Sequence, residues 1–410
     1  MKNKFLSVHI CVFLLFSFYF SQPKKEYSLP QIINIGLQHN PQILATKQKV
    51  KAKKAFYESS KLFFNPEIEF EKGLGESYET QQEVDTGGIS VQQPLENPIK
   101  RKYRISMSEN DWQASRHFLD FIKLEIIYKI KDLYFNILLL KNQKEITAKN
   151  LESIQEIHEL IQERARLGEV KQLEVIKLNV EILKTQNDAE KIKTEMSLAK
   201  DNLNKLMGKA LPSDFSIQGK LEYQELEINQ KSLLDKVFAV HPLVKKKKKE
   251  VALTQDKISF IKWQRLPDPK IKAFMENEID GKNKGLGISM EIPLWNFKSK
   301  EIAEAQSLYL KEREELKALQ MELSTEIKSK FNQLKLSEQK IKLFRTGLLA
   351  QAEESLQIAR ISYEQGEISL IDYLDSQRTY NGVMKDYYLA LYEWNTNTAS
   401  LEKSLGIEIK

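Results

Sequence analysis

The feature that most constrains this chain is a long series of mostly apolar residues separated alternately by four and three positions. Its members are Ile126, Ile130, Leu133, Ile137, Leu140, Thr147, Leu151, Ile154, His158, Ile161 and Ala165, with Lys144 as the one charged interruption, between Leu140 and Thr147. Such spacing predicts a helix with one apolar seam along its length. A helix from about residue 99 to 167 contains ~69 residues and, at ~1.5 Å for each, is roughly 100 Å long. No ordinary globular domain accommodates such a rod, so we predict long helices that pack in pairs.

The second half of the sequence repeats the landmarks of the first half in the same order, about 200 residues later. The recurring landmarks are His39-Asn40-Pro41 with His241-Pro242, Gly88-Ile89-Ser90 with Gly287-Ile288-Ser289, and Gly168-Glu169 with Gly366-Glu367. A second apolar seam also follows the spacing of the first, through Ile327, Phe331, Leu334, Ile341, Leu348, Ala352 and Ala359. We therefore predict two structural repeats, at 22–208 and 229–406, with a connector at 209–228 and a tail at 407–410.

Each repeat is expected to begin with two helical segments, at about 28–39, 41–64, 229–240 and 242–265. Pro41 and Pro242 mark helix starts, because a proline in the first turn loses no hydrogen bond by lacking an N–H group. The neighbouring histidines, His39 and His241, are expected to cap or pack locally rather than to bind a ligand.

After these helices the hydrophobic pattern changes to a period of two, which predicts β-strands. Two strand hairpins are expected, at about 66–94 and 269–293, each ended by a proline. Glycine-rich and polar stretches at 73–88 and 277–287 are expected to form their loops, with Gly73-Leu74-Gly75 as a loop tip.

Four strands cannot close a barrel, and an open sheet would leave two edges that are prone to aggregation. Closure by identical copies of the chain removes both problems, and three copies would give twelve strands. The predicted fold class is therefore mainly α with β. It combines long helical hairpins at about 99–207 and 297–405 with four strands per chain.

The N-terminus has the pattern of a secretory signal peptide, expected at 1–21. Lys2 and Lys4 precede an apolar run from Phe5 to Phe20, which is short for a membrane-spanning helix. Cys11 is the single cysteine and lies in that run, so the mature chain would have no thiol for disulfides or metal ligation. Loss of the two lysines would lower the formal charge from +6 to +4, which gives no reason to expect a nucleic-acid partner.

Sequence signatures of catalysis are absent. The chain has no G-x-S-x-G, no phosphate-binding loop and no H-E-x-x-H, and its mature histidines lack ligand spacing. We therefore expect no enzyme activity, no resident metal and no cofactor.

Two acidic residues after the second Gly-Glu pair are the candidates for function. Asp372 and Asp375 are one helical turn apart and share a face of the helix. Singly, they are solvated carboxylates near a helix N-terminus, stabilised by the helix dipole. In a symmetric assembly each would become a ring of carboxylates, and such rings select cations and can constrict a pore. The first repeat has Glu174 and Lys177 at the matching positions, so only the second repeat carries the full pair.

Together these features resemble the TolC-like outer membrane efflux family over essentially the whole mature chain. The most specific segment runs from Tyr363 to Arg378 and reads YEQGEISLIDYLDSQR. Within the family, Gln93 to Arg101, QPLENPIKR, is similar to the Q-P-L-E-x-G-G-K-R pattern of the CzcC-like heavy-metal efflux branch. Asn97-Pro98-Ile99 departs from the glycines of that pattern.

The resemblance implies a homotrimeric duct, with a twelve-stranded β-barrel in the outer membrane and a twelve-helix α-barrel in the periplasm. It also implies docking of the periplasmic tip on an adaptor protein and an inner-membrane pump. Asp372, Asp375 and Tyr363 would form the closing network and acidic constriction, and Ile368 replaces a basic residue of a related member. The tip residues that would meet the adaptor are Arg166, Leu167, Gly168, Glu169, Gly366 and Glu367.

The function that this resemblance implies is passive export of heavy-metal cations, in the outer membrane, with energy supplied by an RND-type pump. The same duct exporting drugs or secreted protein is one alternative, which the metal or drug sensitivity of a deletion strain would distinguish. A periplasmic coiled-coil scaffold without transport is a second alternative. Four amphipathic strands are the feature that such a scaffold does not need.

Overall fold

The computed structural model describes residues 26–409 except 78, 80 and 227–236. The expected signal peptide at 1–21 and most of the expected helix at 229–240 therefore lie outside the described residues. In chain order the labelled elements are β1 (Glu26–Tyr27), α1 (Leu29–His39), α2 (Pro41–Ser59), β2 (Glu67–Glu76), β3 (Glu83–Pro94), α3 (Pro98–Arg166), α4 (Gln172–Leu206), β4 (Ser216–Ile217), α6 (Pro242–Trp263), β5 (Lys270–Glu278), β6 (Gly281–Ser289), α7 (Ser299–Leu343), the π-helical turn η1 (Phe344–Leu348), α8 (Leu349–Glu364) and α9 (Leu370–Leu405).

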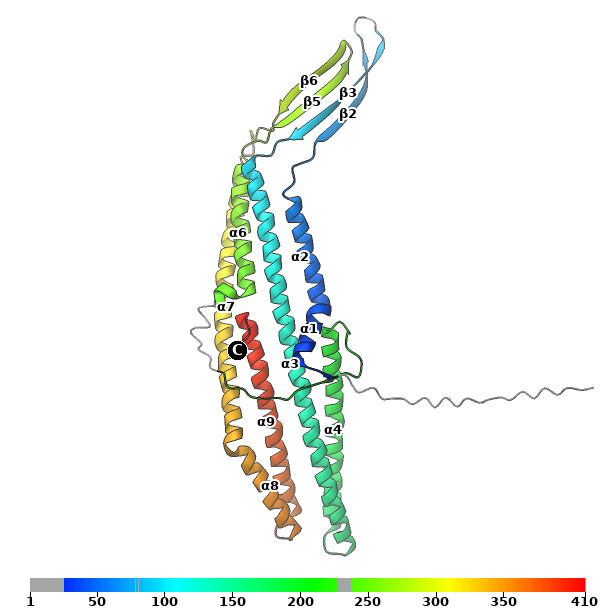
Figure 1. Cartoon of the computed structure of the whole chain (residues 1–410), viewed down its shortest axis with the longest axis vertical. Helices are drawn as coiled ribbons and strands as arrows, with labels where there is room; N and C mark the ends of the chain where they lie inside the picture. The colour runs from blue at the N-terminus through cyan, green and yellow to red at the C-terminus, as the bar shows by residue number, and fades with distance from the viewer. Residues whose placement is uncertain (1–25, 78, 80, 227–236, 410) are drawn as a thin grey trace, which may run out of the picture.

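The molecule is elongated, with the helices along its long axis, the sheet at one end and the turns of the two long helical hairpins at the other (Figure 1). Helix α3 has 69 residues and packs against α2, α4, α6 and α9. Asn97 caps its start by accepting from the Ile99 amide at 2.8 Å, and Pro98 occupies the first turn. The long helix predicted from the apolar seam is thus confirmed.

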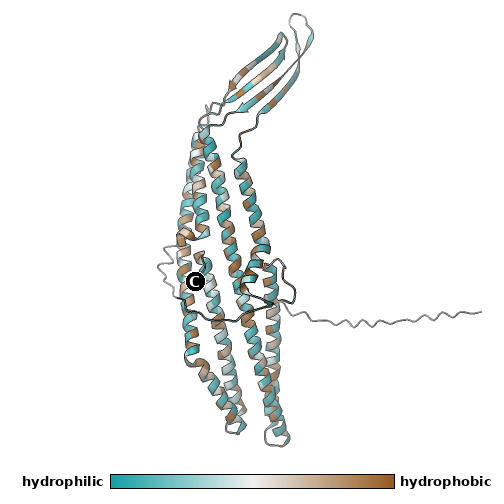
Figure 2. Cartoon of the chain, viewed as in Figure 1, coloured by the Kyte–Doolittle hydropathy of each residue, from teal (hydrophilic) through white to brown (hydrophobic). Residues whose placement is uncertain are grey.

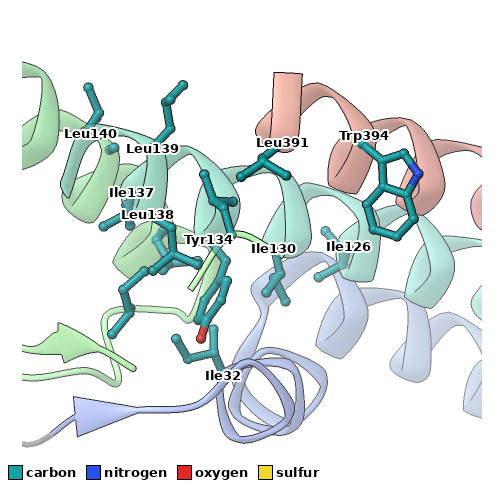
Figure 3. Packing of buried hydrophobic residues seen from close by; sticks show 14 of the residues in the cluster. Ile32, Ile126, Ile130, Tyr134, Ile137, Leu138, Leu139, Leu140, Leu391 and Trp394 are labelled. Atoms are coloured by element: carbon teal, nitrogen blue, oxygen red, sulfur yellow. The ribbon is translucent and has the colours of Figure 1, made fainter. Parts of the chain in front are cut away.

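The predicted seam is also where α3 is buried. Its buried members are Ile126, Ile130, Ile137, Leu140, Thr147, Ile154 and Ile161. Several of them join a core in which α1, α3 and α9 meet, with Ile32 and Trp394 contributed by the other helices (Figure 3). The Tyr134 hydroxyl donates to the carbonyl of Gln218 beside this core. The connector expected at 209–228 thus contains a short strand, β4, which the sequence did not predict. This strand pairs in parallel with β1.

The two predicted strand hairpins form one antiparallel sheet with the order β2-β3-β5-β6. The loops expected at 73–88 and 277–287 were too long, because the strands continue into both stretches and leave only 77–82 and Ile279-Asp280 as connections. Gly73, Leu74 and Gly75 lie within β2 instead of at a loop tip. A Cβ atom on Gly75 would come within 2.8 Å of the Ile279 side chain, so this glycine permits close packing within the sheet.

Two predicted ends were too long. Strand β6 stops at Ser289 instead of near 293, because Ser289 pairs with Lys270 and the preceding Pro269 has no amide hydrogen for a further pair. Helix α2 stops at Ser59 instead of near 64. Arg104 and Arg101 from α3 bind the carbonyl groups of Ser60 and Lys61 and thereby terminate it.

The second long hairpin is interrupted, which the sequence did not predict. Between α7 and α8 the five residues Phe344–Leu348 form a π-helical turn with non-helical backbone at Gly347. The ribbon changes direction there (Figure 1). Among the described residues, no helix combines the length and the apolarity required to cross a membrane.

Candidate functional site

The sheet has two chemically different faces. Side chains alternate along a strand, so residues paired across neighbouring strands point to the same face. One face carries an apolar band formed by Ile68, Phe70, Leu74, Ile89, Val91, Ile271, Ala273, Met275, Leu286 and Ile288. Its polar positions are Lys72, Glu76, Glu83, Asp85, Gln93, Asn277, Lys282 and Lys284, most of them toward the β2–β3 and β5–β6 connections. In the single chain Phe70 is 76% and Leu286 81% exposed. The alternation of hydrophobic and hydrophilic residues is visible along the strands in Figure 2.

The opposite face is polar apart from glycines, Val84, Pro94 and Phe274. Its polar side chains are Glu67, Glu69, Glu71, Thr86, Ser90, Gln92, Lys270, Lys272, Glu276, Glu278, Asn283 and Ser289. Two of its glutamates pair with lysines across the sheet, at 3.5 and 4.0 Å. No strand in the described part of the chain pairs with the outer edge of β2 or of β6. Transmembrane barrels use this alternation, with the apolar side toward lipid and the polar side toward the lumen.

The segment after β3 fastens the sheet to the helices. Lys100 is buried, and its Nζ donates to the Leu266 carbonyl at 2.5 Å and pairs with Asp268 at 2.9 Å. Arg104 pairs with Glu96 at 2.6 Å and donates to carbonyl groups at the end of α2. Cations at helix C-termini are favourable because the helix dipole is negative there. This conformation gives a physical role to Glu96 and Lys100 of the motif.

At the other end of the molecule the two helical hairpins turn with the same backbone. Gly168 and Gly366 both have φ of +79°. In each turn the amide of the following glutamate donates to a carbonyl five residues earlier, at 2.9 Å in the first and 2.8 Å in the second. This is a Schellman motif, which favours glycine at the left-handed position. A Cβ atom at either glycine would meet nothing within 4 Å, so the backbone angle and not the space requires glycine.

The two turns lie close together and are joined by arginine contacts (Figure 1). Arg164 Nη2 donates to the Glu364 carbonyl at 3.1 Å, and Arg360 pairs with Glu156 at 3.4 Å. Leu167 is an exposed apolar side chain at the end of the first turn. The residues predicted at the tips are thus brought to one end of the molecule, and they remain open to solvent in the single chain.

Tyr363 is buried behind the turns and not on the face of the two aspartates. Its ring stacks on Tyr373 with centroids 5.5 Å apart and planes 16° apart. Both rings belong to a tip cluster whose other buried members are Ile154, Ile157, Ile161, Val175, Leu178, Ala359, Leu370 and Leu374. Burial, and to a lesser degree the Glu174 carboxylate, raises the pKa of the Tyr363 hydroxyl.

Asp372 and Asp375 are exposed at the start of α9, and each has a partner. Asp372 and Ser369 form a capping box, in which the Asp372 carboxylate accepts from the Ser369 hydroxyl at 2.7 Å. Asp375 pairs with Arg378 at 3.0 Å, and Arg378 also pairs with Glu181 of α4 at 2.8 Å. Arg378 lowers the pKa of the Glu181 carboxyl.

Sequence reasoning missed these partners, although two signals for them were present. The pattern Ser369-x-x-Asp372 is that of a capping box, and Arg378 follows Asp375 by three residues, which places it on the same helix face. Glu181 had no such signal, because its contact crosses between hairpins. Among the described residues, no three acidic, histidine or cysteine side chains form a group that could hold a metal ion.

An elongated helical chain with a two-faced sheet at one end defines an outer membrane channel component. The chain belongs to the outer membrane efflux protein family, whose profile matches residues 32–209 and 261–407. The family consists of passive channels and not enzymes, in agreement with the expected absence of catalysis.

Individual relatives agree with this assignment. The cobalt-zinc-cadmium resistance protein CzcC of Cupriavidus metallidurans is 21% identical in an alignment 372 residues long that covers 88% of each chain. The fold is similar to that of CusC, with a TM-score of 0.79 and 16% identity over 94% of this chain and 93% of that one. It is also similar to the Campylobacter jejuni channel CmeC, with a TM-score of 0.81 and 14% identity over 92% and 85%. The predicted resemblance to TolC-like and CzcC-like proteins is thereby confirmed.

Proposed function

We propose that three copies of this chain form one continuous exit duct, with a twelve-stranded barrel in the outer membrane and a helical barrel in the periplasm. The observation that carries this proposal is the sheet, which has one apolar face, one polar face and two unpaired edges. An open sheet of this kind exposes apolar side chains and backbone groups to water, which is unfavourable. Closure by β2 of one copy against β6 of the next would satisfy both edges and leave the polar face around a lumen.

The end of the duct away from the sheet would be the gate. Three-fold symmetry would turn Asp372 and Asp375 into two carboxylate rings. Arg378 partly neutralises Asp375, so Asp372 would contribute more of the cation preference. Tyr363 would act indirectly, because it packs beneath α9 and fixes the helix that presents the aspartates. Opening would require the second hairpin to move relative to the first.

The turns are the surface proposed to meet a periplasmic adaptor, with an inner-membrane pump of the RND type beyond it. The residues proposed for this contact are Arg166, Leu167, Gly168, Glu169, Gly366 and Glu367. They combine exposed charge with an exposed leucine on a backbone held by two Schellman motifs. Such a rigid surface with a central apolar side chain suits a protein partner.

The substrate class proposed is heavy-metal cations, which the name of the relative CzcC supports. The chain would act as a wet passage and would not hold the ion at a ligand site. A deletion strain should become sensitive to cobalt, zinc or cadmium and keep its resistance to detergents and dyes. The reverse pattern of sensitivity would assign the duct to drugs, and loss of a secreted protein would assign it to protein export.

Reconstitution tests the duct itself. The purified chain should form conducting pores in planar bilayers and should migrate differently in gels before and after heating, as closed barrels do. Asp372→Asn combined with Asp375→Asn should reduce cation selectivity. A chain that forms no pores and fractionates away from the outer membrane would be a periplasmic scaffold instead. Pores with unchanged selectivity in the double variant would remove only the role of the aspartates.

A further inference from the structure

The two repeats contain a matched pair of joints at which a helix begins beside the end of a long returning helix. In the first joint Asn40 precedes α2, and in the second joint His241 precedes α6. Their backbone angles are nearly the same, with φ and ψ of −61° and 124° for Asn40 and −61° and 126° for His241. Both residues are followed by proline, and both are buried, at 3% and 1% exposed.

Asn40 makes three side-chain hydrogen bonds at its joint. Its Oδ1 accepts from the amides of Gln42 at 2.9 Å and Ile43 at 3.1 Å, which caps the start of α2. Its Nδ2 donates to the carbonyl of Leu206 at 2.9 Å, at the end of α4. The asparagine side chain thereby ties two helix ends together, and it does not titrate.

His241 occupies the same position without making the cap. No side-chain hydrogen bond caps α6, and the buried Nδ1 of His241 has no hydrogen-bonding partner. The ring lies against Phe121 of α3, with centroids 6.5 Å apart. A Cβ atom on Gly406 would come within 3.3 Å of the ring, so the end of α9 closes tightly over it.

Protonation of this ring would place a positive charge in an unfavourable site. The charge would be buried at the start of α6, where the helix dipole is also positive. The Glu326 carboxylate of α7 and the Lys403 backbone favour the charged ring, whereas the Lys403 ammonium of α9 opposes it. From α3, the uncharged Phe121 lies against the ring. Burial is the largest of these influences and lowers the pKa of His241.

We propose that His241 makes the second joint sensitive to acid, whereas Asn40 keeps the first joint insensitive. An unfolded histidine takes up a proton near its ordinary pKa of 6.5, whereas the buried ring resists it. The joint is therefore fully stable above that pH and loses stability as the pH falls below it, until the buried ring itself titrates. The acid response belongs to the fold, and only its effect on conduction rests on the proposed function.

Hydrogen exchange on the full-length protein tests the proposal at four amides. The amides of Lys245 and Gly406 are hydrogen-bonded at the second joint, and those of Leu44 and Gly208 are hydrogen-bonded at the first. Between pH 7.5 and 5.0, after correction for intrinsic exchange rates, protection at the second joint should fall by about tenfold. Protection at the first joint should not change. An equal change at both joints, or none at either, would overturn the proposal.

Exchanging the two residues provides matched variants. His241→Asn should abolish the acid response of the second joint, and Asn40→His should create one at the first. If Asn40→His fails to fold, His241→Gln supplies a second neutral side chain at the titrating joint and should behave like His241→Asn. Retention of the acid response in both His241 variants would assign it to another group. Channel recordings at the two pH values then show whether the loosened joint alters gating, and a lack of pores would contradict only the proposed function.

Discussion

The two helical hairpins have turns with the same backbone and differ in the helices that lead to and from them. Helix α3 runs without interruption into the first turn, whereas the second turn is reached through η1 and α8. Counted forward from the glycines of the turns, Ser369 corresponds to Lys171, which makes no cap, and Tyr373 corresponds to Val175. The second hairpin therefore has a bend between α7 and α8, a capped start of its returning helix α9, and an aromatic stack between α8 and α9.

From this difference we predict different roles for the two hairpins. A continuous hairpin is suited to serve as a fixed wall. In a hairpin that has a bend before a well-ordered tip, the tip can move as a unit and keep its shape. The four predictions below test that contrast, from the largest expected effect to the smallest.

Truncation inside the tip cluster should distinguish the hairpins most strongly. Tyr373→Ala removes a fully buried aromatic ring and should destabilise the tip by about 3–5 kcal/mol. Val175→Ala removes about two methyl groups from the same cluster and should cost about 1.5 kcal/mol. Hydrogen exchange of the tip amides in both variants measures the difference. Equal losses would mean that the aromatic stack adds nothing specific to the second hairpin.

The π-helical turn should open locally more often than the matching part of α3. The amides of 344–348 should exchange at least about tenfold faster than those of 146–150, because the π turn lacks regular helical bonding at Gly347. Mass spectrometry of the exchanged protein at neutral pH is sufficient. Comparable protection in the two segments would show that the bend is rigid and is not a hinge.

The capping box should contribute a smaller amount. Ser369→Ala removes the cap of α9 and should cost about 1 kcal/mol, whereas Lys171→Ser adds a cap to α4 and should stabilise it by a few tenths to about 1 kcal/mol. In thermal unfolding, the melting temperature should therefore fall for Ser369→Ala and rise for Lys171→Ser. A shift of the same sign in both would contradict this prediction.

The contact between the hairpins through Arg378 should have the smallest effect. Arg378→Gln should cost about 0.5 kcal/mol, because solvent screens this partly exposed pair. The pKa of Glu181 is depressed, so the contact stabilises the protein above the ordinary carboxyl pKa of 4.5 and is lost as the pH falls through the depressed value. The variant should lose that acid dependence, as measured by unfolding between pH 6 and pH 3. Lys193→Gln, which breaks an exposed pair within α4, is the control and should leave it unchanged.

Much of the fold could be predicted because its elements are long and periodic. The seam from Ile126 to Ile161 predicted α3, and the period of two predicted the strands. The strand ends and η1 could not be predicted in this way. They depend on contacts between distant residues, such as Arg104 with the end of α2 and Ser289 with Lys270. A single π turn changes the hydrophobic spacing too little to detect.

The candidate site was predictable in its location and not in its contacts. A glycine followed by glutamate predicted each turn, and the aspartates follow the second. The burial of Tyr363 depends on the stack with Tyr373, which joins the two helices of the second hairpin. Asp375 shares Arg378 with Glu181, and the Glu181 contact arises only when the two hairpins lie side by side. The roles of these residues at a gate remain predictions.

The connections at the far end of the sheet are short, with only Ile279 and Asp280 between β5 and β6 and residues 77–82 between β2 and β3. In the proposed arrangement these connections are the outermost part of each copy, among the residues that the structure describes. Antibodies, phages and proteases would therefore find a small target. An epitope inserted between Ile279 and Asp280 would report the orientation of the chain on intact cells.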